Sequence, residues 1–379
     1  MAFIERSTEG KKIIWSEHSN RYLLMEPHAY DVMMQLIGGV NLGKVIQWFN
    51  ESYGLPEREG RRYVREVRDM LEKLTTTEPG ELSGSCQHAI IDSGRFTETK
   101  YYQINDLSIR LDYENDRMKT LIHPKFAHLE ADSLKSDTNF FQLYQQDQEW
   151  VLMFNGVIKG KWNPDQAGLL IGRFFVELLN LIYRKTDEEW MAVFHASGLS
   201  NGEQAILFTG ESGSGKTTLS AILMSQGYQL LSDDMVPFDA RLQEAFSFPA
   251  ALSIKDKALD LLLPIYPELK SAGEFYYPAM NKTVRYLKPD ESPQHERKSM
   301  PCKAIVFVNY QPGSGLKIEK MPKDLAFQQL VPDSWISPLA QNAERFLDWF
   351  LAMPCYQLTY SDNDKMVTAI NQLFENDLF

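Results

Sequence analysis

Residues 210–217 read Gly-Glu-Ser-Gly-Ser-Gly-Lys-Thr and match the pattern G-x-x-x-x-G-K-[ST] at each fixed position. In this pattern a glycine-rich turn directs backbone N–H groups at phosphate oxygens, the lysine reaches the outer phosphates, and the last hydroxyl reaches a magnesium ion. We therefore expect a site for a nucleoside triphosphate such as ATP, together with Mg²⁺. The residues expected at this site are Gly210, Ser212, Gly213, Ser214, Gly215, Lys216, Thr217 and Thr218.

Two adjacent carboxylates, Asp233 and Asp234, begin 17 residues after Lys216 and follow an apolar run at 228–231. If that run is a strand parallel to the one before residue 210, its carboxyl end lies on the phosphate side of the sheet. Two carboxylates there can divide the work, because one can bind Mg²⁺ while the other takes the proton of an acceptor hydroxyl. The alternative is a purely structural turn.

His195 is a further candidate, since it ends the apolar run at 190–194 just before the glycine-rich loop. Its imidazole could act in acid–base chemistry near neutral pH. A packed or solvated histidine is the alternative.

The elements that must position these residues alternate between strands and helices. An apolar run at 205–208 leads into the loop, and helical spacing follows at 218–224. Around them the patterns predict a long helix near 165–184, strands at 190–194, 228–231, 304–308 and 355–358, and a final helix near 364–374. Short alternating runs between 98 and 165 predict a β-rich subdomain with charged loops near 112–118 and 130–138. The fold class is therefore α/β.

Residues 1–80 are predicted to form a separate winged-helix-like module. A strand near 21–25 precedes helices at 28–36, from Asn41 to Gly54, and at 57–74. Asn41 is the expected N-cap of the second helix. The polar stretch at 75–85 is a candidate linker.

Composition restricts the partners of this chain of 379 residues. The net charge of −12 argues against nucleic acid or an anionic membrane as the main partner. The three cysteines are far apart and indicate a reducing compartment, and the first residues lack the pattern of a signal peptide. The apolar stretch at 167–183 is interrupted by Arg173, Glu177 and Asn180 and is expected not to span a bilayer. We expect a cytoplasmic protein.

Three segments together carry a family resemblance. Residues 193–197, 206–218 and 227–234 resemble the catalytic domain of HPr kinase/phosphorylase, and are similar also to HPr kinase-related proteins of bacterial peptide-modification gene clusters. Residues 248–255, 284–289 and 354–358 are similar to further segments of that family. The resemblance covers 98–379, with 98–165 as a β-rich subdomain and 166–379 as the catalytic core.

The resemblance implies phosphoryl transfer from ATP, with Mg²⁺, to a hydroxyl that is usually serine. It implies that Lys216 holds the phosphates, Thr217 and Asp234 bind the metal, Asp233 is the base, and His195 orients them. Lys255 and Arg285 are weaker candidates for contacts with the acceptor or the phosphates. The family's loop for recognising HPr is not recognisable here, so HPr itself is not implied as the acceptor. Relatives are often homo-oligomers.

The N-terminal module resembles PqqD-like domains, which bind the leader segment of a precursor peptide as an added strand. Residues 22–32 and 39–46 carry this resemblance. A DNA-binding winged helix is disfavoured, because the third predicted helix carries six basic and five acidic residues. A structural cap is the other alternative.

The function predicted from these observations is an ATP- and Mg²⁺-dependent kinase for a serine hydroxyl of a peptide or protein that docks on the N-terminal module. Two alternatives remain open at this stage. One is a nucleotide-gated binding protein without phosphoryl transfer, and the other is a kinase of a small-molecule hydroxyl.

Overall fold

The computed structural model describes residues 3–76, 93–132, 139–277, 282–290 and 297–375. The chain forms two compact units, one made of Met1–Gly80 with Lys320–Cys355 and the other of Glu81–Glu319 with Tyr356–Phe379. The first is called the N-terminal unit and the second the P-loop unit. The predicted linker at 75–85 lies almost entirely outside the described residues.

The N-terminal unit contains the predicted strand and three helices, preceded by a hairpin that the sequence analysis did not predict. Its antiparallel sheet has the order β1-β2-β3. Asn41 caps the second helix through its side chain, which accepts a hydrogen bond from the Gly43 N–H, and Gly54 ends that helix in the left-handed conformation. The elements are β1 (Phe3–Thr8), β2 (Lys11–Ser16), β3 (Arg21–Met25), α1 (Pro27–Ile37), α2 (Leu42–Tyr53) and α3 (Glu57–Thr76).

A late segment of the chain completes this unit, whereas the sequence analysis grouped it with the kinase-like domain. The segment contains α8 (Lys323–Leu330), β20 (Trp335–Ile336) and α9 (Ala340–Ala352). The Tyr22 ring lies edge-on to the rings of Phe327 and Phe346, with centroids 6.0 and 5.5 Å away. The Arg6 guanidinium pairs with the Asp348 carboxylate on α9 at 2.6 Å. Aromatic packing and an ion pair therefore join two segments that are far apart in sequence.

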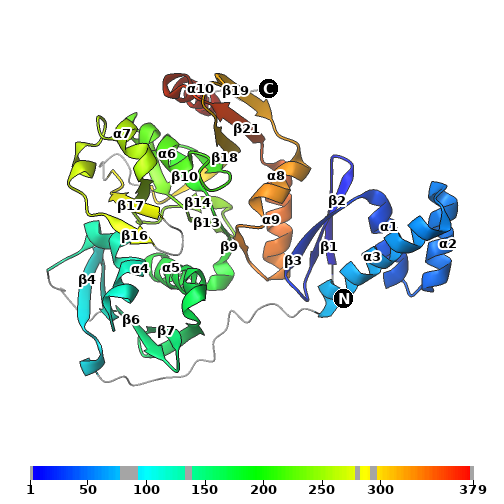
Figure 1. Ribbon diagram of the computed structural model, residues 1–379, viewed down its shortest axis with the longest axis horizontal. Coiled ribbons are helices and arrows are strands. Elements are labelled where there is room, and N and C mark those ends of the chain that lie inside the picture. Colours follow the sequence, from blue (N-terminus) through cyan, green and yellow to red (C-terminus); the bar gives the residue numbers. More distant parts are fainter. Residues whose placement is uncertain (1–2, 77–92, 133–138, 278–281, 291–296, 376–379) are drawn as a thin grey trace. The chain divides into compact units, whose positions relative to one another are not determined.

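The P-loop unit begins with the β-rich subdomain, whose sheet has the order β4-β5-β6-β7-β8. Strands β5 and β6 are parallel and the other neighbours are antiparallel. Helices α4 and α5 lie against this sheet (Figure 1). The elements are β4 (Glu98–Ile104), β5 (Leu107–Tyr113), α4 (Asp116–Phe126), β6 (Asn139–Gln146), β7 (Glu149–Phe154), β8 (Val157–Trp162) and α5 (Ala167–Tyr183).

Helix α4 occupies a stretch that the sequence analysis assigned in part to a charged loop. Its N-cap is Asn115, whose side chain accepts a hydrogen bond from the Met118 N–H. Met118, Ile122 and Phe126 are buried on one face at four-residue spacing. The cap and this spacing were the signals that could have revealed the helix.

Among the described residues, one helical stretch is long and apolar enough to be a candidate membrane span. It is Pro164–Tyr183, which comprises helix α5 and the turn before it. Core helices pass the same test, and this one packs on strands β7 and β8. Glu177 is buried on it and pairs with Lys159 at 3.0 Å and with Arg173. These contacts hold α5 against the sheet of the β-rich subdomain.

The central sheet of the P-loop unit has the order β12-β10-β11-β18-β14-β13-β9, and β21 pairs with β18 and β19. Strand β10 is antiparallel to both β11 and β12, so β11 and β12 point in the same direction with β10 between them. This is the direction that the sequence argument required. The strands are β9 (Trp190–Phe194), β10 (Ser197–Ser200), β11 (Ala205–Thr209), β12 (Gln229–Ser232), β13 (Val236–Asp239), β14 (Glu244–Phe246), β18 (Ser299–Tyr310), β19 (Leu316–Lys320) and β21 (Cys355–Tyr360).

Helices α6 (Lys216–Ser225) and α10 (Asn363–Glu375) and a small sheet of order β15-β17-β16 complete this unit. Its core includes Phe208 of β11, Leu219 of α6 and Ile370 of α10, all fully buried. Burying these side chains fixes the loop between β11 and α6 on a rigid base. The remaining elements are β15 (Leu252–Lys255), α7 (Leu259–Leu262), β16 (Phe275–Tyr277) and β17 (Lys282–Leu287).

Candidate functional site

The glycine-rich loop connects β11 to the N-terminus of α6, as the motif requires. Gly210, Gly213 and Gly215 have φ angles of 142°, 92° and 101°, which residues other than glycine rarely adopt. A Cβ atom at Gly215 would also lie 3.0 Å from the Tyr310 Cβ. The Tyr310 N–H donates a hydrogen bond to the Ser214 carbonyl at 2.8 Å and anchors the loop to β18. The glycines are therefore required by both backbone conformation and close packing.

Two side chains of the loop, those of Lys216 and Ser214, could contact phosphate oxygens. The Lys216 ammonium donates to the Gly210 and Glu211 carbonyls at 2.6 and 3.3 Å, so it is folded back across the loop. The Ser214 hydroxyl is buried without a hydrogen-bond partner in the described part of the chain. A buried polar atom of this kind normally has a partner, and a phosphate oxygen would supply one. Thr218 is half-buried in the first turn of α6.

Asp233 lies at the end of β12, beside the hydroxyl that the motif assigns to magnesium. Its carboxylate oxygen Oδ2 is 3.1 Å from the Thr217 Oγ1, and its other oxygen accepts a hydrogen bond from the Ser197 hydroxyl of β10. Burial and the neighbouring Asp234 carboxylate raise its pKa to about 6. Strand β10 therefore supplies a partner for Asp233 that the sequence analysis did not identify.

Asp234 points to different partners, because its backbone is left-handed with φ at 67°. Its Oδ2 is 3.3 Å from the Lys125 ammonium. Its carbonyl accepts a hydrogen bond of 3.0 Å from the Nδ1 of His195, which must carry the proton because a carbonyl only accepts. Burial opposes ionisation of Asp234, but the interactions with Lys125, His195 and Lys216 outweigh it and lower the pKa of this carboxyl.

The structure brings together the glycine-rich loop, both aspartates and His195, and adds Lys125, which the sequence analysis missed. Lys255 approaches the loop, with its ammonium 3.4 Å from the Ser212 hydroxyl. Arg285 does not join the site, because it pairs with Glu274 and donates to the Leu269 carbonyl at 2.9 Å.

The oxygen ligands fit a magnesium ion that is held partly by the substrate. In the described residues no group of three or more His, Cys, Asp or Glu side chains could hold a metal by itself. Magnesium is usually bound by one or two carboxylates together with substrate phosphates, and Thr217 with Asp233 offers such a partial site. The ion would neutralise charge on the outer phosphates of a bound nucleotide.

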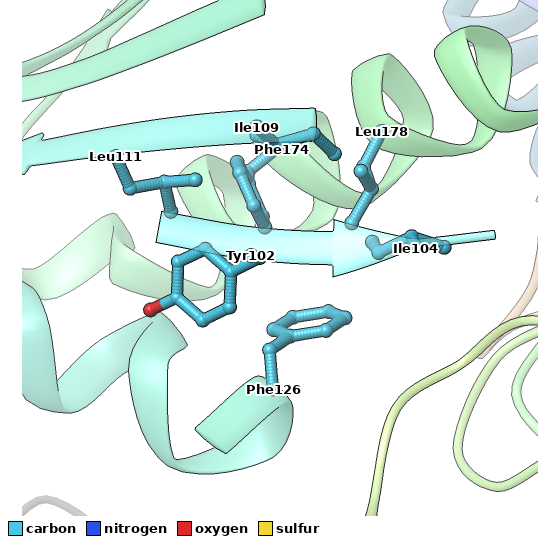
Figure 2. A pocket seen from close by; sticks show the side chains of 7 residues that line it. All are labelled: Tyr102, Ile104, Ile109, Leu111, Phe126, Phe174 and Leu178. Atoms are coloured by element: carbon cyan, nitrogen blue, oxygen red, sulfur yellow. The ribbon is translucent and has the colours of Figure 1, made fainter. Parts of the chain in front are cut away.

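A cavity in the β-rich subdomain is not part of this site (Figure 2). Its volume is about 10 Å³, and its lining is apolar. A space of this size without polar groups holds neither a substrate nor an ordered water. It is lined by Tyr102, Ile104, Ile109, Leu111, Phe126, Phe174 and Leu178.

No family model matches the chain, and no curated protein matches its sequence. Among solved structures the chain is similar to the Hpr(Ser) kinase/phosphatase from Coxiella burnetii, with 13% sequence identity and a TM-score of 0.22. The match covers 49% of this chain and 95% of that chain. A similarity of this size carries no argument about the chemistry, so the function must be argued from the site itself.

Proposed function

We propose that the protein is an ATP- and Mg²⁺-dependent kinase that transfers the γ-phosphoryl group to a hydroxyl, with serine of a peptide or protein as the acceptor. The observation that carries the proposal is the grouping of Lys216, Thr217 and Asp233 at the N-terminus of α6 with a second carboxylate, Asp234, beside them. A nucleotide-binding site needs the first three residues. Transfer to a hydroxyl also needs a base, and Asp234 can supply it.

The distances support roles for the two aspartates that are exchanged relative to the expectation from the family resemblance. Asp233 is the neighbour of Thr217 at 3.1 Å, so we assign the metal to this pair. Asp234 is half-buried and its carboxylate pairs with Lys125, and we assign it as the base. Its lowered pKa keeps the carboxylate ionised near neutral pH, which is the form that a base needs before it takes a proton.

In the proposed reaction the acceptor oxygen forms a bond to the γ-phosphorus, and its proton passes to Asp234. The bond between the γ-phosphorus and the oxygen that bridges to the β-phosphate breaks, and ADP leaves. Lys216 exchanges its two backbone acceptors for phosphate oxygens, which a charge-assisted hydrogen bond favours. His195 holds the Asp234 backbone through its Nδ1–H and thereby orients the base.

A peptide acceptor is supported by the resemblance of residues 1–80 and by the edges of the sheet in the N-terminal unit. Strands β1 and β3 each pair with β2 alone within the three-stranded sheet. An outer strand offers backbone N–H and C=O groups to an extended peptide.

The test uses γ-labelled ATP, Mg²⁺ and purified full-length protein, with candidate peptides that include those encoded beside it. The variants are Asp234→Asn and Lys216→Ala. The control is Lys365→Ala, which changes an exposed lysine on α10 that pairs with Asp362. Label on a peptide serine that is retained in the control and lost in both site variants is the expected result. ATP binding without label on any acceptor would favour a nucleotide-gated binding protein, and label on a small molecule alone would favour the other alternative.

Point variants suit this test better than deletion of residues 1–80. Tyr22 packs on Phe327 and Phe346, so the deletion would expose these rings on the late segment of the same unit. A loss of activity would then report unfolding of that unit as well as loss of docking.

A further inference from the structure

Lys125 reaches the candidate active site from the β-rich subdomain, 109 residues away in sequence from its partner Asp234. Its ammonium lies 3.3 Å from the Asp234 Oδ2, and its side chain is 18% exposed. The Lys125 ammonium donates a hydrogen bond to the Asp234 carboxylate. The other carboxylate of the pair, Asp233, is already bound by Ser197 and Thr217.

The backbone of Lys125 is held in place by contacts with two other segments, residues 248–251 and helix α5. The Ala251 N–H donates to the Lys125 carbonyl at 2.9 Å, just before strand β15. The next residue, Phe126, has its ring packed edge-on against the rings of Phe174 and Phe175 on α5 and of Phe248, with centroids 5.8 to 6.0 Å apart. The anchored backbone limits the positions that the Lys125 ammonium can reach.

The positive charge of Lys125 offsets the repulsion between negatively charged groups in this site. Asp233 and Asp234 are adjacent, and a triphosphate would bring further negative charge to the same place. Without a cation beside it, the Asp234 carboxylate would be repelled from the position it now occupies. The Lys216 ammonium donates to the Gly210 carbonyl of the glycine-rich loop, whereas the Lys125 ammonium lies 3.3 Å from this carboxylate.

We propose that Lys125 is a positioning residue for phosphoryl transfer, which holds the Asp234 carboxylate at the acceptor hydroxyl. The inference rests on the proposed function. It gives the β-rich subdomain a part in the active site, because helix α4 carries a residue that the site needs.

The experiment compares Lys125→Met, Lys125→Arg and the control Lys119→Met in the full-length protein. Lys119 lies on the same helix and pairs with Glu98 and Asp116 at 2.5 and 2.8 Å near the surface. For Lys125→Met we expect kcat to fall about tenfold or more, since orientation of the base is lost, while the KM for ATP stays within about twofold. Lys125→Arg is expected to recover most of kcat, and the control to match the wild type.

Several results would overturn the inference. A rise in KM for ATP as large as the fall in kcat would make Lys125 a phosphate ligand instead. An equal loss in Lys119→Met would show that stability of the helix, not the ion pair, is what matters, and wild-type kcat in Lys125→Met would show that the pair has no role. If Lys125→Met does not fold, Lys125→Gln takes its place in the same comparison.

A measurement that does not depend on activity separates this inference from the proposed function. Urea midpoints are determined for Lys125→Met, Asp234→Asn and the double variant, without nucleotide. If the two side chains form a functional ion pair, the double variant should lose less stability than the sum of the stability losses of the two single variants. Additive losses would refute the pair, whereas coupled losses in a protein that transfers no phosphate would refute the proposed function alone.

Discussion

Replacing Asp233 by asparagine is expected to stabilise the protein without nucleotide while it abolishes phosphoryl transfer. Burial and the Asp234 carboxylate raise the pKa of Asp233 from 3.8 to about 6 in the folded protein. This difference corresponds to about 3 kcal/mol of unfavourable free energy for holding the ionised group. Asparagine carries no charge, but it weakens the hydrogen bonds from Ser197 and Thr217, at about 1 kcal/mol each. The net stabilisation at neutral pH is therefore about 1 kcal/mol.

The pH dependence gives the sign of this effect. The folded state binds the Asp233 proton more tightly than the unfolded state, so the wild type loses stability as pH rises from about 4 to about 6. Above that range the loss is complete and the difference stays constant. The Asp233→Asn variant lacks this titration, and its advantage over the wild type should therefore grow across the same interval.

The assay is urea unfolding followed by circular dichroism between about pH 4 and pH 8, with a chelator and without nucleotide. Asp106→Asn serves as the control, because it removes an exposed carboxylate in the same unit and should shift stability by less than about 0.5 kcal/mol. With Mg²⁺ and ATP added the order should reverse, since the ligand stabilises only the protein that binds it well. An Asp233→Asn variant that is less stable than the wild type by the same amount at every pH would refute the reasoning.

Three further predictions follow from single contacts. Lys216→Ala should weaken ATP binding about 10- to 100-fold in calorimetry, because a charge-assisted contact is lost, and an unchanged Kd would contradict the phosphate role. Gly215→Ala should cost about 1–3 kcal/mol in urea unfolding, since φ is 101° and the new Cβ would meet Tyr310 at 3.0 Å; wild-type stability would refute this. Burial opposes the ionisation of Asp239, but hydrogen bonds from backbone N–H groups and from Lys185 lower its pKa. The ionised carboxylate therefore stabilises the folded protein above about pH 4, and this contribution is lost as the pH falls further. Asp239→Asn should make the urea midpoint depend less on pH below about pH 4.

Local features of the molecule could be predicted from the sequence because they depend on neighbouring residues. The loop between β11 and α6 needs glycines at fixed spacing, and α2 begins at a capping asparagine and ends at Gly54. Strand β9 and helix α5 also follow from short apolar patterns. The mixed α/β class follows from the order of such elements. Helix α4 was missed although its cap and its buried spacing were visible, because charged residues at its start resembled a loop.

Contacts between distant residues could not be predicted in this way. The pairing of Lys125 with Asp234 depends on how the β-rich subdomain packs on the central sheet, through Phe126 and Ala251. The packing of the 320–355 segment with β1 to β3 likewise joins opposite ends of the chain. Such contacts result from many weak apolar interactions acting together, and no short pattern records them.

The sequence by itself determined that a glycine-rich loop of the pattern G-x-x-x-x-G-K-[ST] is followed by two carboxylates, because motif and spacing are local properties of the chain. Only the tertiary structure decided which carboxylate faces Thr217. Asp233 follows directly after β12, and its carboxylate accepts hydrogen bonds from Ser197 and Thr217. Asp234 has a left-handed backbone, and its carboxylate pairs with Lys125 instead. The pKa values of two identical residues are thereby shifted in opposite directions, since each carboxylate responds to the charges and hydrogen bonds that the folded chain places around it.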